Sequence, residues 1–147
     1  MLKTIIFGAS IMTVATAYAA APDDAILYRQ DVMHTIGANA HAMNLIAEGQ
    51  IPYSAAFATH ANLVASAATL AVDAFRQNTH GQGKEKTTAK AEVWQDWAKF
   101  EEGLKLLEER AKTVATLAAS GGAAAAKGAL GELFKTCKGC HDDYRTK

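Results

Sequence analysis

Cysteine, proline and unbalanced charge are scarce in this chain of 147 residues. It contains two cysteines and two prolines, and its 15 basic and 15 acidic residues give a formal net charge of zero. Without a basic excess, the sequence shows no surface of the kind that binds nucleic acid. No alternating polar and apolar segment predicts a strand. Because the length is that of one domain, these absences indicate a single helical domain.

Long hydrophobic runs are also absent, apart from a short one at the N-terminus. Lys3 supplies a positive charge, residues 5–15 form an apolar core, and Ala17-Tyr18-Ala19 is a small-residue cleavage site. The apolar run is too short for a membrane-spanning helix. We therefore expect residues 1–19 to be a cleaved signal peptide. Residues 20–147 should then form one domain in the bacterial periplasm.

The two cysteines belong to one motif near the C-terminus, Cys137-Lys138-Gly139-Cys140-His141. Two cysteines three residues apart, followed at once by a histidine, are typical of a c-type haem attachment site. On a helix the three side chains fall on one face. Each thiol can then add across one haem vinyl group while the imidazole binds the iron.

Other interpretations of the motif are weaker. A thioredoxin-like pair of cysteines follows a strand, and no strand is expected here. A structural zinc site needs a second pair of ligands, and a disulfide across so short a loop would stabilise the fold little. None of these explains the histidine directly after the second cysteine. The sequence therefore predicts one covalently bound haem c.

Apolar residues after the signal peptide follow the spacing of four helices. The predicted helices span residues 23 or 24 to 49, 54 to about 77, 93 to 118 and 123 to 144. Gly49 and Pro52 end the first helix, and Ser54 is suited to cap the second. A polar loop of about a dozen residues precedes the third, which is long for a loop. Short connections elsewhere favour antiparallel neighbours, so the predicted fold is all-α, an antiparallel four-helix bundle with the haem near the C-terminal helix.

Several further segments after the signal peptide are distinctive: Pro22-Asp23-Asp24-Ala25, Tyr28-Arg29-Gln30 with Met33 after it, Gly49-Gln50-Ile51-Pro52-Tyr53, Trp94, and residues 137–145. In these segments the chain resembles the class II cytochromes c, the family of cytochrome c′ and its low-spin relatives with a methionine ligand. The resemblance implies a four-helix bundle, in agreement with the fold predicted from the spacing.

This resemblance places Met33 beside the iron, at the axial position that His141 leaves free. In cytochrome c′ an apolar residue there blocks the site without binding, and the five-coordinate iron admits nitric oxide or carbon monoxide. In the low-spin relatives a methionine sulfur binds the iron and gives an electron carrier. We expect one-electron transfer with His141 and Met33 as axial ligands. The alternative is a gas-binding protein in which Met33 is a gate, since methionine is also a common filler of cores.

Two arginines complete the expected site. Arg29 lies one turn before Met33 on a largely apolar face. A buried guanidinium needs a counter-ion, and the resemblance implies a haem propionate, although an arginine at the edge of a face also extends to solvent. Arg145 follows His141 by four residues. The resemblance implies that it lies near the proximal histidine, and the alternative is a solvated terminal arginine.

Other potential ligands are less suitable. Met43 is almost three turns from Met33, so both cannot face one iron, and we assign Met43 to the core. His60 on the second helix is the strongest rival to Met33. The remaining histidines are expected at surface or boundary positions: His34, His41 and His80.

No acid–base constellation in the sequence suggests an enzyme. The expected partners are small redox proteins or membrane electron-transfer complexes, with nitric oxide or carbon monoxide under the alternative. The resemblance is also compatible with a homodimer formed through the first two helices.

Overall fold

A computed structural model describes residues 19–52 and 55–147. Its helices are α1 (Pro22–Ala47), α2 (Ala56–Ala74), α3 (Glu92–Gln95) and α4 (Trp97–Tyr144). The described residues contain no strand, only one isolated antiparallel bridge between Ala89 and Arg145. The predicted signal peptide lies outside them except for its last residue, and the predicted cap at Ser54 lies outside them entirely.

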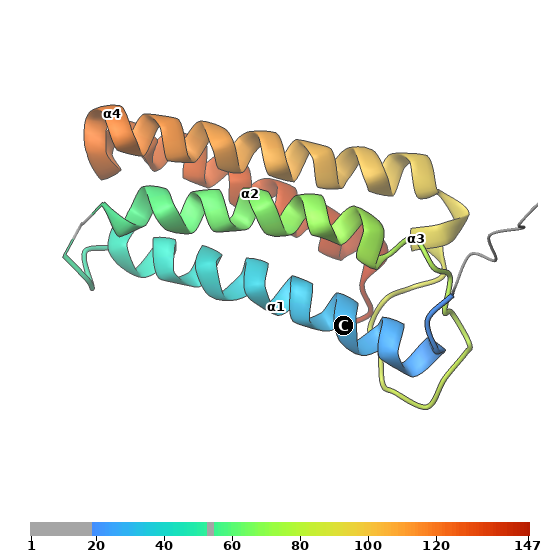
Figure 1. The fold of residues 1–147 in the computed structure, drawn as a ribbon. Coiled ribbons are helices and arrows are strands. Elements are labelled where there is room, and N and C mark those ends of the chain that lie inside the picture. Colours follow the sequence, from blue (N-terminus) through green and yellow to red (C-terminus); the bar gives the residue numbers. More distant parts are fainter. Residues whose placement is uncertain (1–18, 53–54) are drawn as a thin grey trace, which may run out of the picture.

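A kink divides α4 into two helical halves. Gly122 has φ 73° and ψ −171°, a conformation that glycine adopts without steric cost. The chain reverses there, so the second half returns beside the first (Figure 1). With α1 and α2, the two halves of α4 form the predicted four-helix bundle, and the all-α fold class is confirmed.

The predicted end of the first helix at Gly49 is confirmed in detail. Gly49 has φ 74°, its N–H donates to the carbonyl of Ile46 at 3.0 Å, and the Gln50 N–H donates to that of Leu45 at 2.9 Å. These two bonds define a Schellman motif, which satisfies the last carbonyls of a helix. The last helical residue is Ala47.

The core is formed largely by alanines of α2. This helix packs against both α1 and α4 and lies between them in Figure 1. Apart from Phe57 and Val64, its buried side chains are alanines, which allow the helix axes to approach closely. The buried residues of α2 are Phe57, Ala61, Val64, Ala65, Ala67, Ala68, Ala71 and Ala74.

The prediction for the third helix is confirmed for the residues that it buries, but the prediction of one unbroken helix is wrong. Its apolar seam is buried along the first half of α4, at Phe100, Leu104, Leu107, Ala111, Val114 and Ala118. The helix was expected to run unbroken from residue 93. Instead Asp96, with φ −120° and ψ 51°, separates the short α3 from α4. The Trp94 indole N–H donates to the Phe75 carbonyl at 2.7 Å, which fixes α3 against the end of α2.

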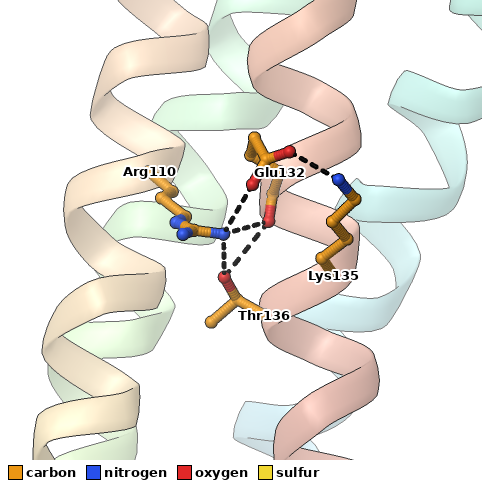
Figure 2. A network of polar contacts seen from close by, with 4 residues as sticks. All are labelled: Arg110, Glu132, Lys135 and Thr136. Atoms are coloured by element: carbon orange, nitrogen blue, oxygen red, sulfur yellow. Dashed lines mark hydrogen bonds and ion pairs between the residues drawn. The ribbon is translucent and has the colours of Figure 1, made fainter.

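Polar contacts hold the two halves of α4 in register (Figure 2). Arg110 Nη1 lies 2.6 Å from the Glu132 carbonyl oxygen and 2.9 Å from Thr136 Oγ1. The Glu132 carboxylate lies 3.5 Å from the same nitrogen and also pairs with Lys135. This network lies on the helical turn directly before Cys137 and links it to the first half of α4.

Among the described residues, no helix is both long and apolar enough to span a membrane.

Candidate functional site

A cavity of about 550 Å³ lies between α1, the two halves of α4 and the loop before α3. This volume is within the range of cofactor sites, roughly 300 to 1,000 Å³. Its walls are mainly apolar, with Ile36, Phe75, Val93, Phe100, Leu104, Leu107 and Phe134. Such walls suit a large, flat and mostly apolar group.

Cys137, Cys140 and His141 all line this cavity, as their helical spacing predicts. Both thiols are free and half-buried, and burial raises the pKa of each. His141 is exposed overall, although part of its ring is covered. Burial of its inner side lowers the pKa of His141, and the Arg145 cation lowers it further. A lowered pKa favours the neutral imidazole, which is the form that binds a metal.

Gly103 makes room for one sulfur of the motif. A β-carbon on Gly103 would lie 3.0 Å from Cys140 Sγ, closer than such contacts normally are. Gly103 is a functional residue that the sequence pattern does not reveal. Its role depends on the contact between two halves of α4 that are far apart in sequence, so no local pattern indicates it.

Met33 lines the cavity from α1 and is half-buried. Met43 is fully buried in the core and does not line the cavity, as predicted. His60 also lies away from the cavity, and its Nδ1 is 2.8 Å from Asn39 Oδ1. His34 was expected to point outward, but it lines the cavity while remaining exposed. Met33 is therefore the methionine that the fold brings to the cysteine motif.

Arg29 is buried, whereas the sequence allowed either a buried guanidinium or one that extends to solvent. Only 1% of its surface is exposed. The guanidinium donates to Thr79 Oγ1 at 2.5 Å and to Thr87 Oγ1 at 3.1 Å. It also stacks over the rings of Phe75 and Trp94, 5.6 and 5.2 Å from their centroids. The alternative of a solvated arginine is thus wrong.

The charge of Arg29 has no carboxylate partner in the described part of the chain. Both hydroxyl acceptors are neutral, and none of the ion pairs among those residues includes Arg29. Burial lowers the pKa of Arg29, yet a guanidinium stays protonated at neutral pH. Since Arg29 also lines the cavity, an anionic group held there would be its counter-ion. A haem propionate fits this requirement.

Arg145 lines the cavity at the other end of the motif and is exposed. Its backbone N–H donates to the His141 carbonyl at 3.2 Å. The structure therefore places Arg145 near His141, where its positive charge disfavours protonation of the imidazole.

The polar loop of residues 78–91 closes one end of the cavity. Thr87, Thr88 and Ala89 line the cavity itself. Asp23 Oδ1, in the first turn of α1, accepts the N–H groups of Lys84 and Glu85 at 2.5 and 3.0 Å. Figure 1 shows this loop beside the start of α1.

The C-terminus holds the same loop from its other side. The Thr146 N–H donates to the Thr88 carbonyl at 2.8 Å, and the Lys90 N–H donates to the Tyr144 carbonyl at 3.0 Å. The sequence predicts this segment only as a polar loop between helices, without a part in the site. Its contacts join residues more than fifty positions apart, so no local signal could have revealed them.

Tyr144 carries a buried polar atom that has no hydrogen-bond partner in the described residues. Its ring packs edge-on against Phe100, with centroids 5.1 Å apart, and its hydroxyl is buried without a hydrogen bond. Tyr144 lines the cavity beside Cys140. The unpaired hydroxyl and the unpaired Arg29 charge both indicate that the cavity is built around a bound group.

Comparison with known proteins identifies the family. A family model described as Cytochrome C' matches residues 24–145. The chain belongs to the cytochrome c′ family. The cytochrome c′ of Halomonas halodenitrificans is 38% identical over 135 residues, covering 87% of this chain and all of the relative. That of Pararhodospirillum photometricum is 34% identical, covering 86% of this chain and 99% of the relative.

Solved structures agree with this assignment. Cytochrome c prime from Shewanella frigidimarina superposes with a TM-score of 0.78 at 34% identity, covering 88% of this chain and 100% of that one. A ferrous variant of the Alcaligenes xylosoxidans protein with bound NO gives a TM-score of 0.75 at 27% identity, covering 88% and 99% of the two chains.

Family membership establishes the cofactor. The chain is a monohaem c-type cytochrome that binds haem c covalently, as predicted from its two cysteines. The relatives are bacterial haem proteins that share the name cytochrome c′. The comparisons favour the gas-binding alternative over electron transfer with a Met33 ligand, and they confirm neither electron transfer nor that ligand.

Proposed function

We propose that this cytochrome binds a small diatomic gas, nitric oxide or carbon monoxide, with His141 as the only protein ligand to the iron. Cys137 and Cys140 are the attachment points of the haem. Met33 is a gate beside the free axial position. Ferrous haem supplies an iron that binds such gases when one axial position is free.

The observation that carries this proposal is the space beside Met33. Beside Ile36, the next turn of α1 presents the small residues Gly37, Ala38 and Ala40 to the cavity. These small residues leave space beside Met33 for a diatomic ligand. A larger residue at these positions would fill that space together with the Met33 side chain. The relative from Alcaligenes xylosoxidans supports the chemistry, because solved structures of its variants include one with bound NO and a nitrosyl complex.

The residues around the cavity each have a defined part in this function. His141, favoured in its neutral form, offers an imidazole nitrogen to the iron. Arg29 is the counter-ion for a propionate, and Arg145 holds positive charge near the proximal histidine. The apolar walls exclude water, which favours a neutral diatomic ligand over polar competitors.

An absorption spectrum of the purified, exported protein tests the proposal. We expect a broad high-spin ferrous spectrum that changes when carbon monoxide is added. A sharp low-spin α-band that carbon monoxide leaves unchanged would contradict it. Met33→Ala should keep the high-spin spectrum and bind carbon monoxide at least as fast as the wild type, because it only removes the gate.

Electron transfer is the second candidate, and the position of Met33 is the observation that favours it. Of the methionines in the described residues, Met33 lines the cavity and its sulfur is a known type of haem ligand. Under this function, small redox proteins or membrane electron-transfer complexes are the partners. Met33→Ala would then convert a low-spin spectrum into a high-spin one that responds to carbon monoxide.

The location and assembly of the protein are part of the same proposal. Residues 1–19 are removed on export to the periplasm, and residues 20–147 remain as the haem domain. The protein forms a homodimer through α1 and α2, where Leu27, Leu63 and Leu70 are exposed. Intact mass should equal residues 20–147 plus one haem, and sedimentation should give twice that mass.

A further inference from the structure

Gly37 occupies an unfavourable place for a glycine. It lies in the middle of α1, where glycine is less favourable than alanine because its backbone loses more freedom on folding. A β-carbon built on it would meet no atom within 4 Å. No described neighbour in the protein therefore requires its missing side chain.

Gly37 is exposed, and the open space beside it adjoins the cavity next to Met33. The two residues are one turn apart on α1, and both line the cavity. Helical side chains lean toward the N-terminus of their helix. A side chain at position 37 would therefore lie over the turn that contains Met33 and His34, and glycine leaves that region clear.

We propose that the space at Gly37 receives the Met33 side chain when a diatomic gas enters the cavity. This inference rests on the proposed gas-binding function. Met33 and His141 line the cavity from different helices, so a gas held on the α1 side must displace the Met33 thioether. Methionine has three rotatable side-chain bonds and adapts readily to a neighbouring space. Gly37 thus determines how easily the gate opens.

Carbon monoxide binding to the ferrous holoprotein tests the role of Gly37. We compare the wild type with Gly37→Leu, Gly37→Ala and Gly128→Leu. Gly128 is a matched control, since it is also a helical glycine with no atom within 4 Å of an added β-carbon, and it does not line the cavity. Gly37→Leu should lower the affinity by about tenfold or more, because overpacking resists the displaced side chain. Gly37→Ala should have a smaller effect, and Gly128→Leu should match the wild type within about twofold.

Two further measurements identify Met33 as the displaced group. If Gly37 acts through Met33, the double variant Met33→Ala with Gly37→Leu should lose most of the effect of Gly37→Leu. Independently of affinity, the NMR signal of the ¹³C-labelled Met33 methyl group should shift on addition of carbon monoxide. In Gly37→Leu that shift should be smaller.

Different failures of this experiment have different meanings. Equal affinity in the wild type and Gly37→Leu would overturn the inference and leave the gas-binding function intact. A wild type that binds no carbon monoxide would overturn the proposed function, and the inference with it. Loss of haem from Gly37→Leu but not from Gly128→Leu would also overturn the inference, because the space would then belong to the porphyrin.

Discussion

The energetic cost of burying the charge of Arg29 depends on whether the cavity holds an anionic group. Its guanidinium is almost fully buried and bonds only neutral hydroxyls, Thr79 Oγ1 and Thr87 Oγ1, in the described structure. Burying a charge is costly unless an opposite charge lies nearby. The aromatic faces of Phe75 and Trp94 offset part of this cost. A propionate would offset the remainder, so the free energy of haem binding and the burial of Arg29 are coupled.

Replacing Arg29 should therefore affect the haem-loaded protein far more than the haem-free one. Arg29→Met should lower the free energy of unfolding of the holoprotein by about 3 kcal/mol, since it removes one partner of a buried ion pair. In the haem-free protein the same change should cost less, because there the charge has no counter-ion. Urea titrations of both forms measure this difference. Arg76→Met is the control, as Arg76 is exposed, and equal losses in both forms would contradict the propionate role.

Gly103 is a second residue whose identity follows from one contact. Gly103→Ala would place a β-carbon 3.0 Å from Cys140 Sγ, so the sulfur or the helix must shift. We expect a lower fraction of protein with attached haem, measured by intact mass. Gly128→Ala, where the added carbon meets open space, should retain full attachment and gain stability of up to about 1 kcal/mol. Full attachment in Gly103→Ala would show that Cys140 tolerates the added carbon.

The loop of residues 78–91 is fixed to α1 by a single carboxylate, that of Asp23. Asp23 accepts two backbone N–H groups of this loop, which lowers the pKa of its carboxyl group. Gly83, with φ 76°, passes so close to Asp23 Oδ1 that a β-carbon would collide with it. The loop in turn supplies the hydroxyl of Thr87 to Arg29. Asp23 therefore helps to close the cavity without lining it.

The contribution of Asp23 should depend on pH in a defined direction. Its pKa is lower in the folded than in the unfolded protein, so its charge stabilises the fold above the unfolded-state pKa. That stabilisation is lost as the pH falls through the folded-state pKa. Asp23→Asn should therefore lower the urea midpoint at neutral pH, and the difference from wild type should vanish in acid. Asp24→Asn, which removes a charge from the same helical turn, is the matched control variant.

For the whole molecule, the cavity makes the fold dependent on its cofactor. About 550 Å³ lined by apolar side chains is far larger than the voids of an ordinary core. The residues on its two sides, in α1 and in the second half of α4, meet mainly across this space. The alanine-rich contact of α2 with α1 and α4 does not involve the cavity and should persist without haem.

Removing the haem should loosen one side of the bundle selectively. In Cys137→Ala/Cys140→Ala, purified without haem, hydrogen exchange should be faster in residues 29–37 and 79–89 than in the wild type. Residues 61–71 of α2 should keep most of their protection. Uniformly faster exchange in all helices would instead show that the whole bundle depends on the haem.

Much of this organisation could be predicted because it rests on local spacing. Helical periodicity indicates the buried seam from Phe100 to Ala118, and it places Cys137, Cys140 and His141 on one face. Gly49 and Gly122 end helices because they take up positive φ, which is a property of the residue itself. The break at Asp96 was not predicted, and beside it Trp94 makes a contact between distant segments, its hydrogen bond to the end of α2, which no local pattern specifies.

The sequence by itself determined most of the helices and the haem motif, since these depend on residue type and on spacing along one helix, and the resemblance to a known family pointed to Met33. Only the tertiary structure decided that Arg29 is buried without a carboxylate partner, that the loop closes the cavity, and that Gly103 and Gly37 leave space beside Cys140 and Met33. The reason is physical. Burial, counter-ions and free volume are properties of contacts between segments distant in the chain, and no local pattern of residues specifies them.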